Sequence, residues 1–138
     1  MLTKPDLQRL AQLRLEDALF LLQSNRCSSA YYLAGYSVEL GLKARIAGLF
    51  QPNAIPDLAF VKAIYTHRFE TLLSSAGLRS EFEQTTRSDP QFEAYFALAS
   101  NWTEESRYAF WDPFAAAALV EAVAEPNHGV FQWIKKHW

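Results

Sequence analysis

The hydrophobic residues of this chain recur at helical spacing along most of its length. The clearest stripe follows Thr3-Lys4-Pro5-Asp6, a run typical of a helix start in which Thr3 caps the helix. The stripe continues to about Gln23, with apolar residues on one face: Leu7, Leu10, Ala11, Ala18, Leu21 and Leu22. The pattern predicts a first helix that buries this face.

The segment from Ser29 to about Phe50 predicts a second helix that is apolar on nearly every side. Ser28 or Ser29 is expected to cap its N-terminus. Small residues lie seven apart along one strip, at Ala34, Gly41 and Gly48. Each glycine costs about 1 kcal/mol relative to alanine, a cost that close approach of another helix offsets. We therefore expect this helix to lie at the centre of the fold.

The middle of the chain is less clearly patterned. Residues 51–57 contain two prolines and predict a loop, whereas residues 58–65 are compatible with a short helix or an extended segment. Thr66 is expected to cap a helix that runs to about Ala76 and is stopped by Gly77. The polar residues 78–87 are ambiguous.

Two Asp-Pro pairs, Asp89-Pro90 and Asp112-Pro113, predict the starts of the remaining helices. Residues 126–129 interrupt the last helix, because a proline inside a helix costs about 3 kcal/mol, and a short apolar turn follows. The whole pattern predicts an all-α fold over residues 1–138, organised as one domain: an antiparallel up-and-down bundle of about five helices.

Composition excludes several classes of protein. Half of the 138 residues are apolar and 20% are charged, which is typical of a folded core and not of a disordered chain. The net charge of −2 excludes a uniformly basic coat for nucleic acid, although residues 1–69 have a balance of +3 and residues 70–138 one of −5. A single cysteine, Cys27, excludes an internal disulfide framework. No run is apolar enough to span a membrane, so we expect a cytoplasmic protein.

Candidate chemistry concentrates on one side of the second helix. Tyr32, Tyr36, Glu39, Lys43 and Phe50 fall within about 60° of one another on the helical wheel. This stripe is either the solvent edge of the helix or a polar inclusion that fixes packing or lines a groove. If it is buried, each charge needs a partner, since an unpaired buried ion costs several kcal/mol.

Three further side chains have open interpretations. Arg14 interrupts the apolar stripe of the first helix, so either its head reaches water or it pairs with Glu39. His67 is expected to be the first residue of its helix and is either a surface residue or a base. Arg107, beside Tyr108, can stack on an aromatic ring, pair with Glu39 or bind phosphate. No residue spacing indicates a metal or cofactor site.

The run Ala30–Ala44 resembles the second-helix signature of the HEPN superfamily (higher eukaryotes and prokaryotes nucleotide-binding domain), with its small residues, tyrosines, glutamate and lysine. Supporting segments follow in the order typical of that family: Thr66-His67, Leu72-Leu73, Arg107-Tyr108 and Trp133–Lys136. The resemblance implies a helical bundle that often forms a homodimer and acts near nucleotides or RNA. Some HEPN proteins are ribonuclease toxins, and others pair with a small nucleotidyltransferase.

HEPN ribonucleases share an arginine followed, after four to six residues, by a histidine. In this chain Lys62 stands in place of the arginine before His67, and lysine lacks the planar fork that holds a phosphate. The resemblance therefore predicts a non-catalytic binding module without cofactor, whose ligand-binding residues are Tyr32, Tyr36, Glu39, Lys43, His67, Arg107 and Tyr108.

Two alternatives stay open at this point. The first is a metal-independent ribonuclease in which His67 is the base and Lys62, Arg68 or Arg107 holds the phosphate. The second is an adaptor that binds only other proteins.

Overall fold

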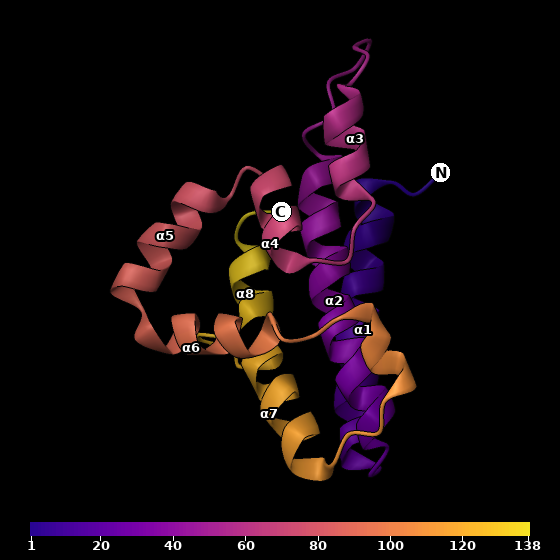
Figure 1. Cartoon of the computed structure of the whole chain (residues 1–138), viewed down its shortest axis with the longest axis vertical. Helices are drawn as coiled ribbons and strands as arrows, with labels where there is room; N and C mark the ends of the chain where they lie inside the picture. Colours follow the sequence, from indigo (N-terminus) through magenta and orange to yellow (C-terminus); the bar gives the residue numbers. More distant parts are fainter.

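The computed structural model describes all residues from 1 to 138 and contains α-helices, one short 3-10 helix and no strand (Figure 1). The elements are α1 (Lys4–Gln23), α2 (Cys27–Ala47), α3 (Leu58–Ile64), α4 (Phe69–Ser75), α5 (Arg79–Ser88), α6 (Pro90–Ala99), η1 (Glu104–Tyr108), α7 (Pro113–Ala124) and α8 (Val130–Lys135). The all-α prediction is confirmed. The expected number of helices is too low, because both ambiguous segments form helices (α3 and α5) and the interrupted last helix forms two.

The helices do not alternate in direction throughout. Figure 1 shows α1 and α2 side by side and antiparallel, whereas α7 runs in the same general direction as α2. Five short helices connect α2 to α7. Of these, α3 lies beyond the C-terminal end of α2, and α5 and α6 lie to one side of it (Figure 1). The strictly up-and-down arrangement is therefore not what the chain adopts.

The start of α1 follows its local sequence signal. The Thr3 hydroxyl accepts a hydrogen bond from the backbone N–H of Asp6, and the Asp6 carboxylate accepts one from the backbone N–H of Thr3 at 3.0 Å. This reciprocal pair is a capping box. One face of α1 then packs against α2 and buries Leu7, Ala11, Leu15 and Ala18.

The start of α2 differs from the expectation. The helix begins at Cys27, so neither Ser28 nor Ser29 caps it. The Ser28 hydroxyl instead accepts a hydrogen bond from the backbone N–H of Trp111 at 2.9 Å, and the Tyr31 ring stacks on the Trp111 ring at 3.7 Å. The serine is therefore used to attach the segment before α7 to the first turn of α2.

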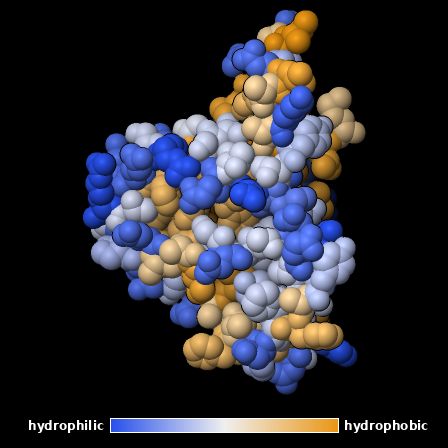
Figure 2. Space-filling view, in the orientation of Figure 1, coloured by the Kyte–Doolittle hydropathy of each residue, from blue (hydrophilic) through white to orange (hydrophobic).

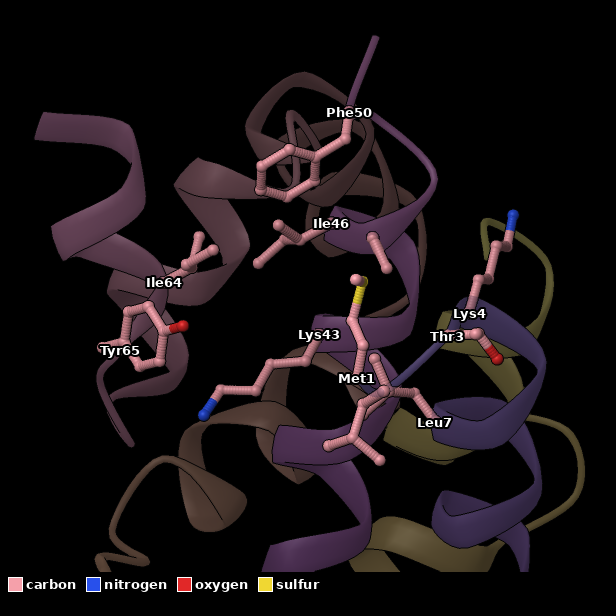
Figure 3. Close-up of a pocket in the computed structure, with 11 residues that line it drawn as sticks. Met1, Thr3, Lys4, Leu7, Lys43, Ile46, Phe50, Ile64 and Tyr65 are labelled. Carbon is pink, nitrogen blue, oxygen red and sulfur yellow. The ribbon is translucent and has the colours of Figure 1, made fainter. Parts of the chain in front are cut away.

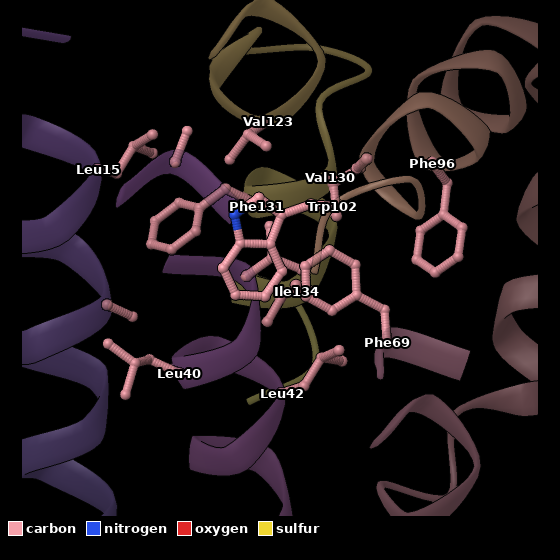
Figure 4. Packing of buried hydrophobic residues seen from close by; sticks show 14 of the residues in the cluster. Leu15, Leu40, Leu42, Phe69, Phe96, Trp102, Val123, Val130, Phe131 and Ile134 are labelled. Atoms are coloured by element: carbon pink, nitrogen blue, oxygen red, sulfur yellow. The ribbon is translucent and has the colours of Figure 1, made fainter. Parts of the chain in front are cut away.

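As expected, α2 is the central helix, and two of its glycines allow close packing. The Trp102 ring lies directly on Gly35, and the Ile134 side chain lies against Gly41. Figure 4 shows Trp102, Phe69 and Ile134 gathered around α2 in the hydrophobic core. Gly48 differs from the prediction, because it is exposed at the C-terminus of α2 and lies against the flexible Lys4 side chain and the Arg45 carbonyl of its own helix, with no second helix packed on it as tightly as at Gly35.

Arg45 holds two distant segments against the C-terminal part of α2. Its guanidinium group donates hydrogen bonds to the backbone carbonyls of Ala76, at 3.2 Å, and His137, at 3.1 Å. The side chain thereby fixes the end of α4 and the C-terminus of the chain to the same helix.

Candidate functional site

Glu39 is a buried acid at the centre of the polar stripe on α2. Its side chain is 1% exposed, whereas those of Lys43 and His67 are 26% and 47% exposed. The Lys43 ammonium lies 3.3 Å from Oε1 of Glu39, and Nδ1 of His67 contacts the same oxygen. Of the two interpretations of the stripe, the polar inclusion is therefore confirmed for Glu39.

The segment between α3 and α4 brings His67 to this carboxylate. The prediction that Thr66 caps the helix is wrong, because α4 begins at Phe69. The Thr66 hydroxyl instead accepts a local hydrogen bond from the backbone N–H of Arg68 at 3.3 Å. Phe69 is buried and stacks on Trp102 at 5.4 Å, which fixes the start of α4 against the core and leaves His67 in the connection before it.

The Glu39–His67 contact determines what the imidazole can do. A carboxylate that contacts Nδ1 fixes the orientation of the ring and leaves Nε2 as the nitrogen available to another group. Because the imidazole is half exposed, Nε2 can form a hydrogen bond with a ligand or transfer a proton. Lys43 is the second partner that offsets the cost of burying the acid.

The two tyrosines of the stripe extend the site along α2. The Tyr32 and Tyr36 rings stack with centroids 5.9 Å apart, and Tyr32 also lies 5.9 Å from Trp102. Burial, with the nearby charge of Glu39, raises the pKa of the Tyr36 hydroxyl. Like any tyrosine hydroxyl, it is protonated at neutral pH and can donate a hydrogen bond.

Arg107 lies at the other end of this row and does not pair with Glu39. Its guanidinium carbon lies 4.9 Å from the centroid of the Tyr108 ring, and the side chain is exposed. The hydroxyl of Tyr108, followed by that of Tyr32, raises the pKa of Arg107. Arg107 and Tyr32 also line a small hollow of about 220 Å³ at the start of α2.

Two other predicted partners form no ion pair with the buried acid or with His67. Arg14 forms an ion pair with Asp17 at 3.4 Å instead of with Glu39, because the aspartate lies one turn away on the same helix. Lys62 is exposed on α3 and forms no hydrogen bond or ion pair with His67.

Two hollows border the Glu39 cluster. The first, of about 730 Å³, is polar and is lined by His67 and Arg68 together with Glu70, Glu104 and Glu105. The second, of about 760 Å³, is mostly apolar, and Lys43 lies on its wall (Figure 3). Figure 3 shows the Lys43 ammonium pointing away from Ile46 and Phe50, on the side of Tyr65.

No group of three or more His, Cys, Asp or Glu side chains is arranged to hold a metal ion. Every helix of the structure is too short or too polar to cross a membrane. The chain matches no known protein-family profile, no curated protein and no solved structure. Function is therefore inferred from the side chains and their geometry.

Proposed function

We propose that this chain is a HEPN-like helical module that binds nucleotides or RNA without cleaving them. The observation that carries this proposal is a row of accessible cationic and aromatic side chains along α2, which we call the α2 strip: Arg107, Tyr32, Tyr36, Lys43 and His67. Between Tyr32 and Lys43 the strip is about 16 Å long, since each helical residue advances the axis by about 1.5 Å.

The chemistry of the strip fits a single-stranded nucleic acid. Cations bind the phosphates, and aromatic rings offer surfaces on which bases stack. Arg107 is exposed at one end of the strip, and the half-buried Tyr32 and Tyr36 follow it. At the other end Glu39 has His67 as a second partner, so the Lys43 ammonium can turn toward a phosphate without leaving the buried acid unpaired.

The resemblance of residues 30–44 to the HEPN signature supports the same ligand class. Binding is favoured over cleavage because lysine replaces the arginine of the ribonuclease motif, and Lys62 forms no hydrogen bond or ion pair with His67 in the folded chain. The strip therefore has residues for holding RNA, whereas the position that the ribonuclease motif gives to an arginine has a lysine, which lacks the planar fork that holds a phosphate.

A pair of double variants tests the proposal. Arg107→Ala with Lys43→Ala removes both ends of the strip, whereas Arg87→Ala with Lys136→Ala removes two exposed cations elsewhere. Binding is measured by fluorescence anisotropy with a labelled single-stranded RNA of about ten nucleotides. Titration with AMP in a calorimeter separates nucleotide binding from RNA binding, and thermal melting checks that each variant is folded.

We expect the strip variant to lose at least about tenfold in RNA affinity. The affinity of the strip variant should also depend less on salt: the slope of log K against log[salt] should become shallower by about 0.7 for each phosphate contact that is lost. The control variant should match the wild type in both affinity and slope. A wild-type protein that binds neither RNA nor AMP contradicts the proposal. A strip variant that binds RNA as tightly as the control also contradicts it.

The Glu39–His67 contact favours a second candidate function, metal-independent RNA cleavage. In this reaction Nε2 of His67 takes the proton of a ribose 2′-hydroxyl as that oxygen attacks the adjacent phosphate. The bond from phosphorus to the 5′-oxygen of the next nucleotide breaks, and that oxygen leaves as a hydroxyl with a proton from water, so the products are a 2′,3′-cyclic phosphate and a 5′-hydroxyl end. Labelled tRNA and mRNA are incubated with the wild type and with His67→Ala. Cleavage by the wild type alone establishes the ribonuclease, and no cleavage by either protein excludes it.

The expected protein partners remain predictions. A nucleotidyltransferase recovered with the full chain after nuclease treatment supports an adaptor that needs no RNA. Loss of that partner on nuclease treatment indicates instead that RNA links the two proteins.

A further inference from the structure

The polar hollow of about 730 Å³ lies at the His67 end of the α2 strip. Its walls are the connection from α3 to α4 and the segment that leads from α6 into η1. Both segments cross α2 in the view of Figure 1, and Figure 2 shows mostly hydrophilic side chains on this face. A volume in this range is typical of sites that hold a small molecule or one part of a larger ligand.

Two of the three carboxylates that line the hollow have no cationic partner. Glu70 is paired with Arg79 at 3.0 Å. Glu104, which is half-buried, and Glu105, which is exposed, form no ion pair. Because a carboxylate repels a phosphate and accepts hydrogen bonds, the hollow favours a group that donates hydrogen bonds over the RNA backbone.

The other side chains of the hollow favour a neutral aromatic group. His67 and Arg68 line the hollow together with the acids, which disfavours a cationic ligand. Tyr65 lines it with a side chain that is 82% exposed, so its ring is available for stacking. Figure 3 shows the Lys43 ammonium on the side of Tyr65. A strand whose phosphate is held by Lys43 can therefore stack a base on Tyr65 and direct the edge of that base into the hollow.

The free carboxylates distinguish among the four bases of RNA. An ionised carboxylate accepts hydrogen bonds through two oxygens and donates none. Guanine presents two neighbouring donors, N1–H and N2–H, on its Watson–Crick edge, whereas in adenine, cytosine and uracil an acceptor lies next to the donor. The remaining acceptor on the guanine edge, O6, can receive a hydrogen bond from Arg68 in the same hollow.

We propose that this hollow binds a guanine base of the RNA, with the base stacked on Tyr65 and its N1–H and N2–H donated to the Glu104 carboxylate. Glu104 has this role in preference to Glu105 because a half-buried side chain loses less conformational freedom on binding than an exposed one. Guanine binding rests on the proposed function, since the α2 strip holds the phosphates of the same strand.

Fluorescence anisotropy with labelled RNAs of about ten nucleotides tests the guanine site. One RNA contains only adenine, and the other contains a single central guanine. We expect the wild type to bind the guanine RNA at least about tenfold more tightly, because the carboxylate accepts two hydrogen bonds from guanine and adenine offers one donor. A third RNA has inosine at the centre, which lacks the N2 amino group, and should bind with an intermediate affinity.

Three variants separate the contributions to this preference. Glu104→Gln replaces one acceptor by a donor, so the two RNAs should bind with about the same affinity. Glu105→Gln is the matched control, because it removes the same charge from the same hollow, and it should keep the preference. Tyr65→Ala should weaken both RNAs by at least about fivefold and leave their ratio unchanged, since every base has a face that stacks. Thermal melting checks that each variant is folded.

The outcomes separate this site from the proposed function. Equal binding of the guanine and adenine RNAs by the wild type overturns the guanine site and leaves RNA binding by the α2 strip in place. Loss of the preference in Glu105→Gln but not in Glu104→Gln overturns the role of Glu104. A wild type that binds neither RNA contradicts the proposed function, and the guanine site with it.

Discussion

Replacing Gly35 by alanine tests how tightly the core surrounds α2. A Cβ atom at this position would lie 2.2 Å from two atoms of the Trp102 ring. Carbon atoms that are not bonded are most stable at about 3.5–4.0 Å, so the buried indole would have to move by more than about 1 Å. The ring is also stacked on Phe69, which limits such a movement.

The expected magnitude follows from two opposing effects. Alanine gains about 1 kcal/mol of helix propensity over glycine inside a helix. Overpacking a core costs about 1–3 kcal/mol and occasionally more, and the overlap at Gly35 is severe. We expect Gly35→Ala to lower the free energy of unfolding by about 2 kcal/mol. Gly48→Ala should raise it slightly, because the nearest atom, 3.1 Å away, is the ammonium of the flexible Lys4 side chain.

Urea unfolding followed by circular dichroism measures both variants, with stability read from the transition midpoint and the exposed surface from the slope. The chemical change is the same at the two glycines, and helix propensity favours alanine most inside the helix, at Gly35. A lower stability of Gly35→Ala than of Gly48→Ala therefore reports the contact with Trp102. If Gly35→Ala unfolds at the same urea concentration as Gly48→Ala, or at a higher one, Trp102 does not lie on Gly35.

Three further predictions concern polar contacts. Glu39→Gln should lower the free energy of unfolding by about 2 kcal/mol. A double-mutant cycle with His67→Gln should give a coupling energy of about 0.5–3 kcal/mol between the two side chains. A coupling energy of zero means that the two side chains do not touch. A hydrogen bond to Asp89 raises the pKa of His128 in the folded chain. The contact therefore stabilises the fold fully at pH values below the pKa of His128 in the unfolded chain, and this stabilisation is lost as pH rises through the pKa of His128 in the folded chain. The melting-temperature difference between wild type and His128→Asn should therefore be larger near pH 6 than near pH 9, and a constant difference is the contrary result. Arg45→Met removes donors to two backbone carbonyls and should speed hydrogen exchange of the C-terminal residues; unchanged exchange contradicts this role.

Helix starts with a local cause were predictable from the sequence. The side chains of Thr3, Asp89 and Asp112 each accept a hydrogen bond from a backbone N–H three residues later, so the signal and its partner lie within one turn. Ser28 and Thr66 have the same side-chain chemistry and failed as caps. The Ser28 hydroxyl accepts a hydrogen bond from the backbone N–H of Trp111, which is distant in the sequence, so tertiary structure decides its role. The Thr66 hydroxyl accepts a hydrogen bond from the backbone N–H of Arg68, in a local turn that comes before the helix.

The partners of the buried acid were less predictable. Glu39 and Lys43 are one helical turn apart, and their pairing follows from spacing, whereas His67 is 28 residues away and reaches Glu39 only through the connection between α3 and α4. Charge alone also suggested Arg14 and Arg107 as partners of Glu39. Both arginines contact nearer groups instead, since a neighbour on the same helix or turn is reached at little cost in chain entropy.

The placement of the RNA-binding surface on α2 is tested most directly by nuclear magnetic resonance of the isotope-labelled chain during titration with single-stranded RNA. The proposal predicts that the signals that move most belong to the α2 strip, above all to Tyr32, Lys43, His67 and Arg107, and that those of α5 stay in place. Signals that do not move, or movements concentrated on α5 and α6, would contradict it.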